Sequence, residues 1–84
     1  EIMKIDNVDD IKAFLKTVDE CDGQVWMQSV KGDQYNLKSL LTQYIVIGEM
    51  VKNHKNDMEL FCELTADEGR FYDFFSKHPA VLEA

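Results

Sequence analysis

The sequence is short of positive charge. Its 84 residues include nine Lys and Arg against 16 Asp and Glu, which gives a formal net charge of −7. Nucleic acids and anionic membrane surfaces both reward clustered Lys and Arg. The composition therefore argues against binding to either of them.

Long apolar runs are also missing. The longest, Tyr44–Ile47, has four residues, far below the roughly 18 that suggest a membrane-spanning helix. The ends lack the pattern of a signal peptide, and there is no internal repeat or linker-like segment. An apolar share of 45% argues against disorder. We therefore expect a single cytoplasmic domain over residues 1–84, a size at which small domains fold alone.

The chain has little that could perform chemistry. Cys21 and Cys62 lack the C-x-x-C spacing, so we expect reduced, buried thiols, with a disulfide as the less motivated alternative. Acidic neighbours would make Cys21 a poor nucleophile. His54 and His78 do not share a helical face with other ligands at metal-binding spacing, so we expect surface histidines. The sequence thus predicts no enzyme, no cofactor and no metal site.

What the chain does contain is a regular succession of strand and helix patterns. Strand-like stretches are Ile2–Ile5, Gln24–Val30, Gln34–Leu37 and Met58–Leu64. Helical stretches run from Asn7 to about Cys21, from Ser39 to about Lys52, and from Thr65 to near His78. The β-branched run Ile45–Ile47 leaves a late strand as an alternative within the second helix. The segment Lys52–Asp57 is expected to be a polar connector, and Ala80–Ala84 a tail.

Several residues are typical signals of helix ends and turns. Asn7 and Ser39 suit N-caps, and Thr65 with Glu68 has the form of a capping box. Gly23 is expected to end the first helix in a left-handed conformation. Lys31–Asp33 is expected to be the turn of a hairpin.

The apolar positions indicate how these elements pack. One face of the first helix carries Val8, Ile11, Phe14, Leu15 and Val18, and one face of the last strand carries Met58, Leu60, Cys62 and Leu64. Because each helix has one apolar stripe, we expect three helices on one side of a four-stranded antiparallel sheet. This is an α+β open-faced sandwich of order βαββαβα, with the opposite sheet face partly solvated.

A strand pattern changes to a helix pattern at Ser39. From there apolar residues recur at helical spacing: Leu40, Leu41, Tyr44, Ile45, Ile47 and Val51. A serine at this place is most simply a cap. A helix N-terminus also favours an anion, so Ser39 is in addition a candidate phosphorylation switch.

The stretch Asn36-Leu37-Lys38-Ser39-Leu40-Leu41, together with the order βαββαβα, resembles HPr, the phosphocarrier of the bacterial phosphotransferase system. The resemblance implies an HPr-like fold and a regulatory serine modified by an ATP-dependent kinase, a role that would fall on Ser39. It also implies that Leu40, Leu41 and Tyr44 belong to a patch that docks protein partners. Such partners would be a kinase, a transport-system component or a transcription regulator.

One feature of that family is missing. Its phosphoacceptor histidine precedes the first helix, but Ile5–Ile11 contains no His, Arg or Pro and has three aspartates. A phosphohistidine site needs an imidazole and groups that hold phosphoryl oxygens. We therefore expect a non-catalytic, regulatory binding protein that is unable to carry phosphohistidine.

Trp26 and Phe61 fall on the strand faces opposite the expected core. Either one of them covers a sheet edge or the strand register is slipped by one residue, or the two form an exposed aromatic patch for a partner or a second copy. A self-associating structural or interaction module without phosphorylation, a possible homo-oligomer, is therefore the alternative function. An enzyme that uses Cys21 or Cys62 is the third and least supported possibility.

Overall fold

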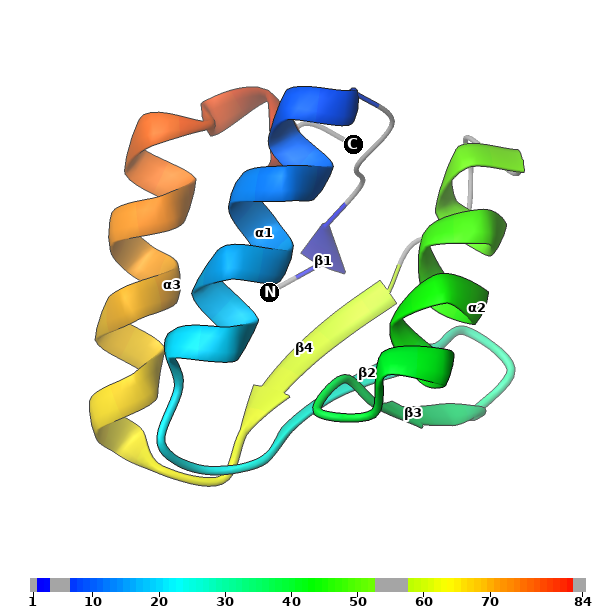
Figure 1. Cartoon of the computed structure of the whole chain (residues 1–84), viewed down its shortest axis with the longest axis horizontal. Helices are drawn as coiled ribbons and strands as arrows, with labels where there is room; N and C mark the ends of the chain where they lie inside the picture. The colour runs from blue at the N-terminus through cyan, green and yellow to red at the C-terminus, as the bar shows by residue number, and fades with distance from the viewer. Residues whose placement is uncertain (1, 4–6, 53–57, 83–84) are drawn as a thin grey trace.

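The computed structural model describes residues 2–3, 7–52 and 58–82, and its elements follow the predicted order (Figure 1). The strands are β1 (Ile2–Met3), β2 (Val25–Ser29), β3 (Gln34–Asn36) and β4 (Met58–Cys62). The helices are α1 (Val8–Glu20), α2 (Leu40–Lys52) and α3 (Thr65–Lys77), followed by a 3₁₀ turn, η1 (Pro79–Leu82). The end of the first predicted strand, His54 and most of the predicted connector lie outside the described residues.

The sheet is antiparallel throughout, with strand order β1-β4-β2-β3. β2 pairs with β3 on one side and with β4 on the other, whereas β1 adds only two residues, along β4. Gly32 closes the β2–β3 hairpin at a φ of +92°, a conformation that glycine adopts without strain. The predicted α+β class, with three helices and an antiparallel sheet, is confirmed.

One core joins the three helices to the inward side of the sheet. The Phe14 ring of α1 lies 5.8 Å, centroid to centroid, from both Phe71 and Phe74 of α3. In Figure 1, α1 and α3 stand side by side while α2 covers the end of the sheet near β3. The core consists of Phe14, Val18, Cys21, Val25, Met27, Leu37, Val46, Met58, Phe71, Phe74, Phe75 and Val81. Within the described residues, no helix covers the other face of the sheet.

Some predicted inward positions lie elsewhere. Val8 is 64% exposed in the first turn of α1, and Leu64 is 42% exposed beyond the end of β4. Leu37, by contrast, follows β3 and is still buried, and Val81 of the predicted tail is buried in η1. The run Ile45–Ile47 is helical, so the alternative of a late strand is wrong.

Two predicted signals of helix ends are wrong. Gly23 does not adopt a left-handed conformation, and α1 ends on Cys21 as its C-cap. A Cβ at Gly23 would lie 2.7 Å from Leu64 Cγ, so close packing is what requires glycine there. The N-cap of α3 is Leu64, which makes no side-chain capping bond, and the predicted Thr65–Glu68 capping box is not formed.

Asp67, in the first turn of α3, contacts the α1–β2 loop. Its side chain is fully buried, and its carboxylate accepts the backbone N–H groups of Gly23 at 2.8 Å and Asp22 at 3.1 Å. Arg70 Nε donates to the same carboxylate at 3.4 Å. The Gly23 N–H, more than any other group, holds the pKa of Asp67 below its ordinary value although burial opposes this. Asp67 therefore fastens the start of α3 to the α1–β2 loop.

Candidate functional site

Ser39 begins α2 as an N-cap. Its carbonyl oxygen accepts the Gln43 N–H at 2.9 Å, which is the first helical hydrogen bond. Its hydroxyl oxygen accepts the Thr42 N–H at a longer 3.4 Å. The side chain is exposed to solvent. The geometry agrees with the predicted cap on a residue that is exposed to solvent.

The first turn of α2 has unpaired backbone N–H groups. In the described part of the chain, the backbone N–H groups of Leu40 and Leu41 donate to no protein atom. Such unpaired donors, with the positive end of the helix dipole, favour an anion beside them. A phosphate on Ser39 would therefore meet donors that are not already engaged.

The turn before Ser39 is held from several directions. Asn36 Oδ1 accepts the Lys38 N–H at 2.9 Å, and Lys38 Nζ donates to the carbonyl of Cys21 at the end of α1. Gln43, which no local sequence pattern marks, is buried and donates to Leu37 O at 2.7 Å and to Asp19 Oδ1 at 3.3 Å. The N-terminus of α2 is thus fixed against α1.

An exposed apolar surface lies directly after Ser39. The exposed fractions are 63% for Leu40, 70% for Leu41, 66% for Tyr44 and 49% for Ile45. Residues three and four positions apart are neighbours on a helix surface, so Tyr44 lies beside both Leu40 and Leu41, and Ile45 lies beside Leu41. The four side chains therefore form a single surface, here called the α2 patch. Val46 on the opposite side is fully buried. The three predicted docking residues are therefore brought together, and Ile45 joins them.

The sequence places only carboxylates among the charged residues at the entrance to α1, but the fold brings an imidazole there. Asn7 Oδ1 caps the helix by accepting the N–H groups of Asp9 at 2.8 Å and Asp10 at 3.3 Å. The imidazole of His78, at the end of α3, lies there too, with Nδ1 2.6 Å from Asp10 Oδ1. Its ring stacks on Phe74 at a centroid distance of 4.9 Å. His78 is thus a partly buried residue with a carboxylate partner, and not a simple surface histidine.

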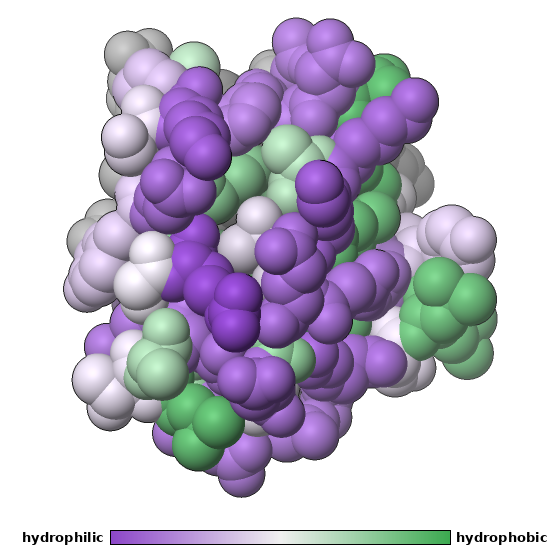
Figure 2. All heavy atoms as spheres, turned by 60° about the vertical axis from the view of Figure 1, so that its left-hand side comes forward, coloured by the Kyte–Doolittle hydropathy of each residue, from purple (hydrophilic) through white to green (hydrophobic). Residues whose placement is uncertain are grey.

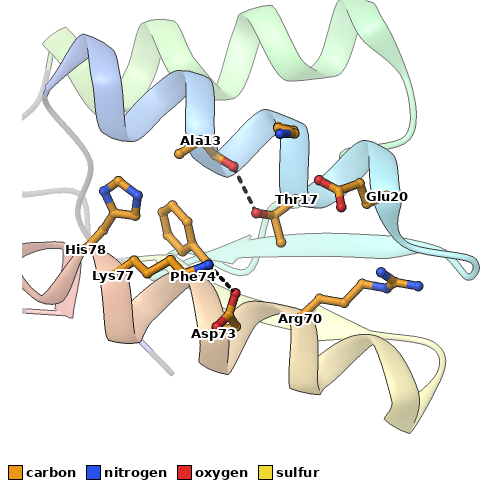
Figure 3. A pocket seen from close by; sticks show the side chains of 9 residues that line it. Ala13, Thr17, Glu20, Arg70, Asp73, Phe74, Lys77 and His78 are labelled. Carbon is orange, nitrogen blue, oxygen red and sulfur yellow. Dashed lines mark hydrogen bonds and ion pairs between the residues drawn. The ribbon is translucent and has the colours of Figure 1, made fainter.

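His78 also lines a groove of about 380 Å³ between α1 and α3 (Figure 3). The groove contains cations, but most of them have carboxylate partners within the chain: Lys77 Nζ lies 3.0 Å from Asp73, and Arg70 contacts both Asp67 and Asp22. Figure 2 shows that this side of the molecule is largely hydrophilic. Of the three Lys and Arg side chains that line the groove, Arg70 and Lys77 are therefore already paired with carboxylates of the chain.

The two thiols are free and shielded. Cys21 is buried and its Sγ donates to Thr17 O at 3.2 Å, while Cys62 is half-buried. Burial raises the pKa of Cys21, and burial with the nearby Cys21 raises the pKa of Cys62 to about 11. Thiols of this kind are poor nucleophiles near neutral pH. The described residues hold no group of three or more His, Cys, Asp or Glu arranged for a metal ion.

Within the described residues, no helix is long and apolar enough to span a membrane. Ser39 with the α2 patch is the candidate site that α2 brings together. Comparisons with protein-family models, curated proteins and solved structures found no match to this chain.

Proposed function

We propose that this chain is a non-catalytic, HPr-like regulatory protein that binds a protein partner through the α2 patch. The observation that carries the proposal is four large apolar side chains, from Leu40 to Ile45, exposed beside an accessible serine. Exposed apolar side chains gathered on one surface are typical of interaction sites. The element order supports the four-stranded open-faced sandwich of HPr as the scaffold, and the partner would be a kinase, a transport-system component or a transcription regulator of the cytoplasm.

Ser39 is the switch in this proposal. Phosphorylation would add a charge of about −1.5 to −2 at the edge of the α2 patch. The unpaired N–H groups of Leu40 and Leu41 would hold the phosphate, so the modified helix would stay formed. Desolvating a phosphate beside Leu40 and Leu41 is costly, so a partner that prefers an apolar surface would be released.

Phosphocarrier chemistry on histidine is not part of the proposal. His78 does lie near the entrance of α1, but its Nδ1 faces the Asp10 carboxylate at 2.6 Å. That negative charge, in a molecule of net charge −7, would repel an incoming phosphoryl donor. Ser39, by contrast, is exposed and has unpaired donors beside it.

Incubation with ATP and the serine kinase of the HPr family, followed by intact mass measurement, tests the switch. We expect one added phosphate on the wild-type chain and none on Ser39→Ala. Ser76→Ala, an exposed serine in α3, is the matched control and should be modified like the wild type.

Acid treatment of the product separates the two phosphate chemistries. A phosphoserine survives acid, whereas a phosphohistidine is hydrolysed. Phosphate that is lost in acid would assign the modification to a histidine and overturn the proposal. Phosphate that persists in Ser39→Ala but not in His78→Gln would place it on His78. An unmodified wild-type chain would remove the switch.

A further inference from the structure

The open face of the sheet carries an aromatic pair surrounded by neutral and acidic residues. Trp26 of β2 lies directly opposite Phe61 of β4, on the face that bears no helix. Phe61 is 43% exposed and Trp26 is half-buried. A shallow groove of about 320 Å³ runs over the pair and is lined by Trp26, Gln28, Gln34 and Phe61. The exposed-patch reading of these two aromatics therefore agrees with the geometry.

Among the outward positions of β2, β3 and β4, the charged side chains are acidic. Side chains two positions apart on a strand share a face, so Glu59 of β4 flanks Phe61 on one side, and Glu63, the first residue after β4, continues this alternation on the other side. Glu63 accepts the Gln24 N–H with one oxygen at 3.1 Å, whereas the Glu59 carboxylate has no hydrogen-bond or ion-pair partner among the described residues. The other outward positions of β2 and β3 are Gln28, Gln34 and Asn36. No Lys or Arg occupies an outward position of β2, β3 or β4.

We propose that this face, here called the sheet face, binds an arginine-bearing extended segment of a protein partner. A guanidinium can stack on an indole or phenyl ring and at the same time donate to a carboxylate. The Gln28 and Gln34 amides in the groove offer both donors and acceptors to the backbone of such a segment. The proposal does not depend on Ser39 or the α2 patch, which belong to the helical layer.

A second copy of the chain fits the same face less well. Two sheet faces in contact would bring Glu59 and Glu63 of both copies together, and like charges at an interface oppose association. Each copy also carries a net charge of −7. A cationic segment removes this repulsion and replaces it with attraction.

Trp26 is the only tryptophan, so its fluorescence reports directly on the sheet face. The probe is a capped peptide with arginine at alternate positions, titrated into the full chain at low salt. We expect a saturable change of Trp26 emission with half-saturation below about 1 mM, weakened severalfold at high salt. A peptide of the same length with glutamate in place of arginine should cause no change.

Two charge variants and one control locate the binding. Glu59→Gln should weaken binding by about threefold, and the double variant Glu59→Gln/Glu63→Gln by about tenfold. Glu20→Gln makes the same charge change on α1, far from the sheet face, and should leave the affinity unchanged. Amide chemical shifts should move in β2, β3 and β4.

Three results would overturn the proposal. No response to the arginine peptide up to several millimolar would exclude the site. An equal loss of affinity in Glu20→Gln, or shifts centred on the α1–α3 groove, would show attraction by net charge alone. Emission that changes with protein concentration, together with a dimer in sedimentation, would assign the sheet face to a second copy.

Discussion

Ser39 stabilises the second helix as its N-cap. Its carbonyl oxygen accepts the Gln43 N–H, and its hydroxyl oxygen accepts the Thr42 N–H. Replacing a capping serine by alanine typically costs about 1 kcal/mol, whereas aspartate is an equally good cap. We therefore expect Ser39→Ala to lower the free energy of unfolding by about 1 kcal/mol and Ser39→Asp to be neutral or slightly stabilising. Urea unfolding measures both.

Ser76→Ala is the control for the Ser39 variants. Ser76 is exposed inside α3, where alanine is the better helix former, so the change should be neutral or mildly stabilising. An equal loss of stability in Ser76→Ala and Ser39→Ala would show that the Ser39 cap contributes nothing specific.

Asp67 should make stability fall in acid. The Gly23 N–H, and to a smaller extent the Asp22 N–H and Arg70, hold the pKa of Asp67 below its ordinary value near 3.8. As the pH falls, the Asp67 carboxylate is therefore protonated in the unfolded chain at a higher pH than in the folded chain. The stability from Asp67 is complete above about pH 5 and is lost as the pH falls through the pKa of the folded state.

Asp67→Asn tests this assignment. It removes the charge and leaves an amide where two backbone N–H groups need acceptors, so the melting temperature at pH 7 should fall by several degrees. The acid dependence of the melting temperature should also become shallower. Asp73→Asn, an exposed residue in the same helix, is the control and should change neither quantity strongly. If the melting temperature of Asp67→Asn fell in acid as steeply as that of the wild type, Asp67 would not be the source of the acid dependence.

Cys62 should react slowly with thiol reagents in the folded protein. Burial, with Cys21 nearby, raises the pKa of Cys62 to about 11, so little thiolate is present at pH 8. We expect alkylation by iodoacetamide at pH 8 to be much slower in the native chain than in urea, and to accelerate up to about pH 11. Mass spectrometry follows the reaction, and fast native labelling of Cys62 would contradict the shielding.

At the scale of elements, one side of α2 stabilises the fold, and the other side carries the proposed binding residues. Val46 is fully buried on one side of the helix, while Leu41 is 70% exposed on the other. Val46→Ala should cost about 2 kcal/mol because it leaves a cavity in the core. Leu41→Glu should change stability by less than about 0.5 kcal/mol but abolish binding to any partner of the α2 patch.

A pull-down from the source cell compares wild-type chain with Leu41→Glu, and urea unfolding verifies that the variant is folded. Glu20→Gln, on α1, serves as a surface control that should keep every partner. Partners that bind Leu41→Glu as well as the wild type would place docking outside the α2 patch.

The elements could largely be predicted from the sequence because their signals are local. Alternation at Met58, Leu60 and Cys62 and helical spacing at Phe14 and Val18 depend only on neighbouring residues. Polar contacts between distant segments could not be predicted. Asp67 reaches Gly23 across 44 positions and His78 reaches Asp10 across 68, and no local pattern marks either pair.

The candidate site was predicted for the same reason that the elements were. Ser39, Leu40, Leu41 and Tyr44 are consecutive or one turn apart, so a single helix was enough to bring them together. Their exposure could not be read from helical spacing, since the spacing of Leu40 and Leu41 equally suits a buried stripe. Gln43 and Val46 are buried residues of α2. Which side of α2 faces the core depends on its contacts with α1 and with the end of β3, which helical spacing does not reveal.

The whole molecule concentrates negative charge in a small volume. A net charge of −7 is carried by a fold with a Cα radius of gyration of 11.5 Å. Repulsion among like charges opposes both the compact state and contact between copies, and salt screens it. Raising the salt concentration from low to physiological values should therefore raise the melting temperature.

The same charge predicts a monomer. Both apolar surfaces, the α2 patch and the sheet face, lie on a molecule whose copies repel one another, and Glu59 and Glu63 sit within the sheet face itself. Sedimentation at low salt should give one species whose mass does not change with concentration. Glu59→Gln/Glu63→Gln reduces the net charge to −5 (−7 plus two removed charges) and is the variant most prone to pair. A wild-type dimer that is lost in a folded Trp26→Ser variant would instead show that the sheet face serves self-association. Such a dimer would require an aromatic contact that outweighs the repulsion between copies.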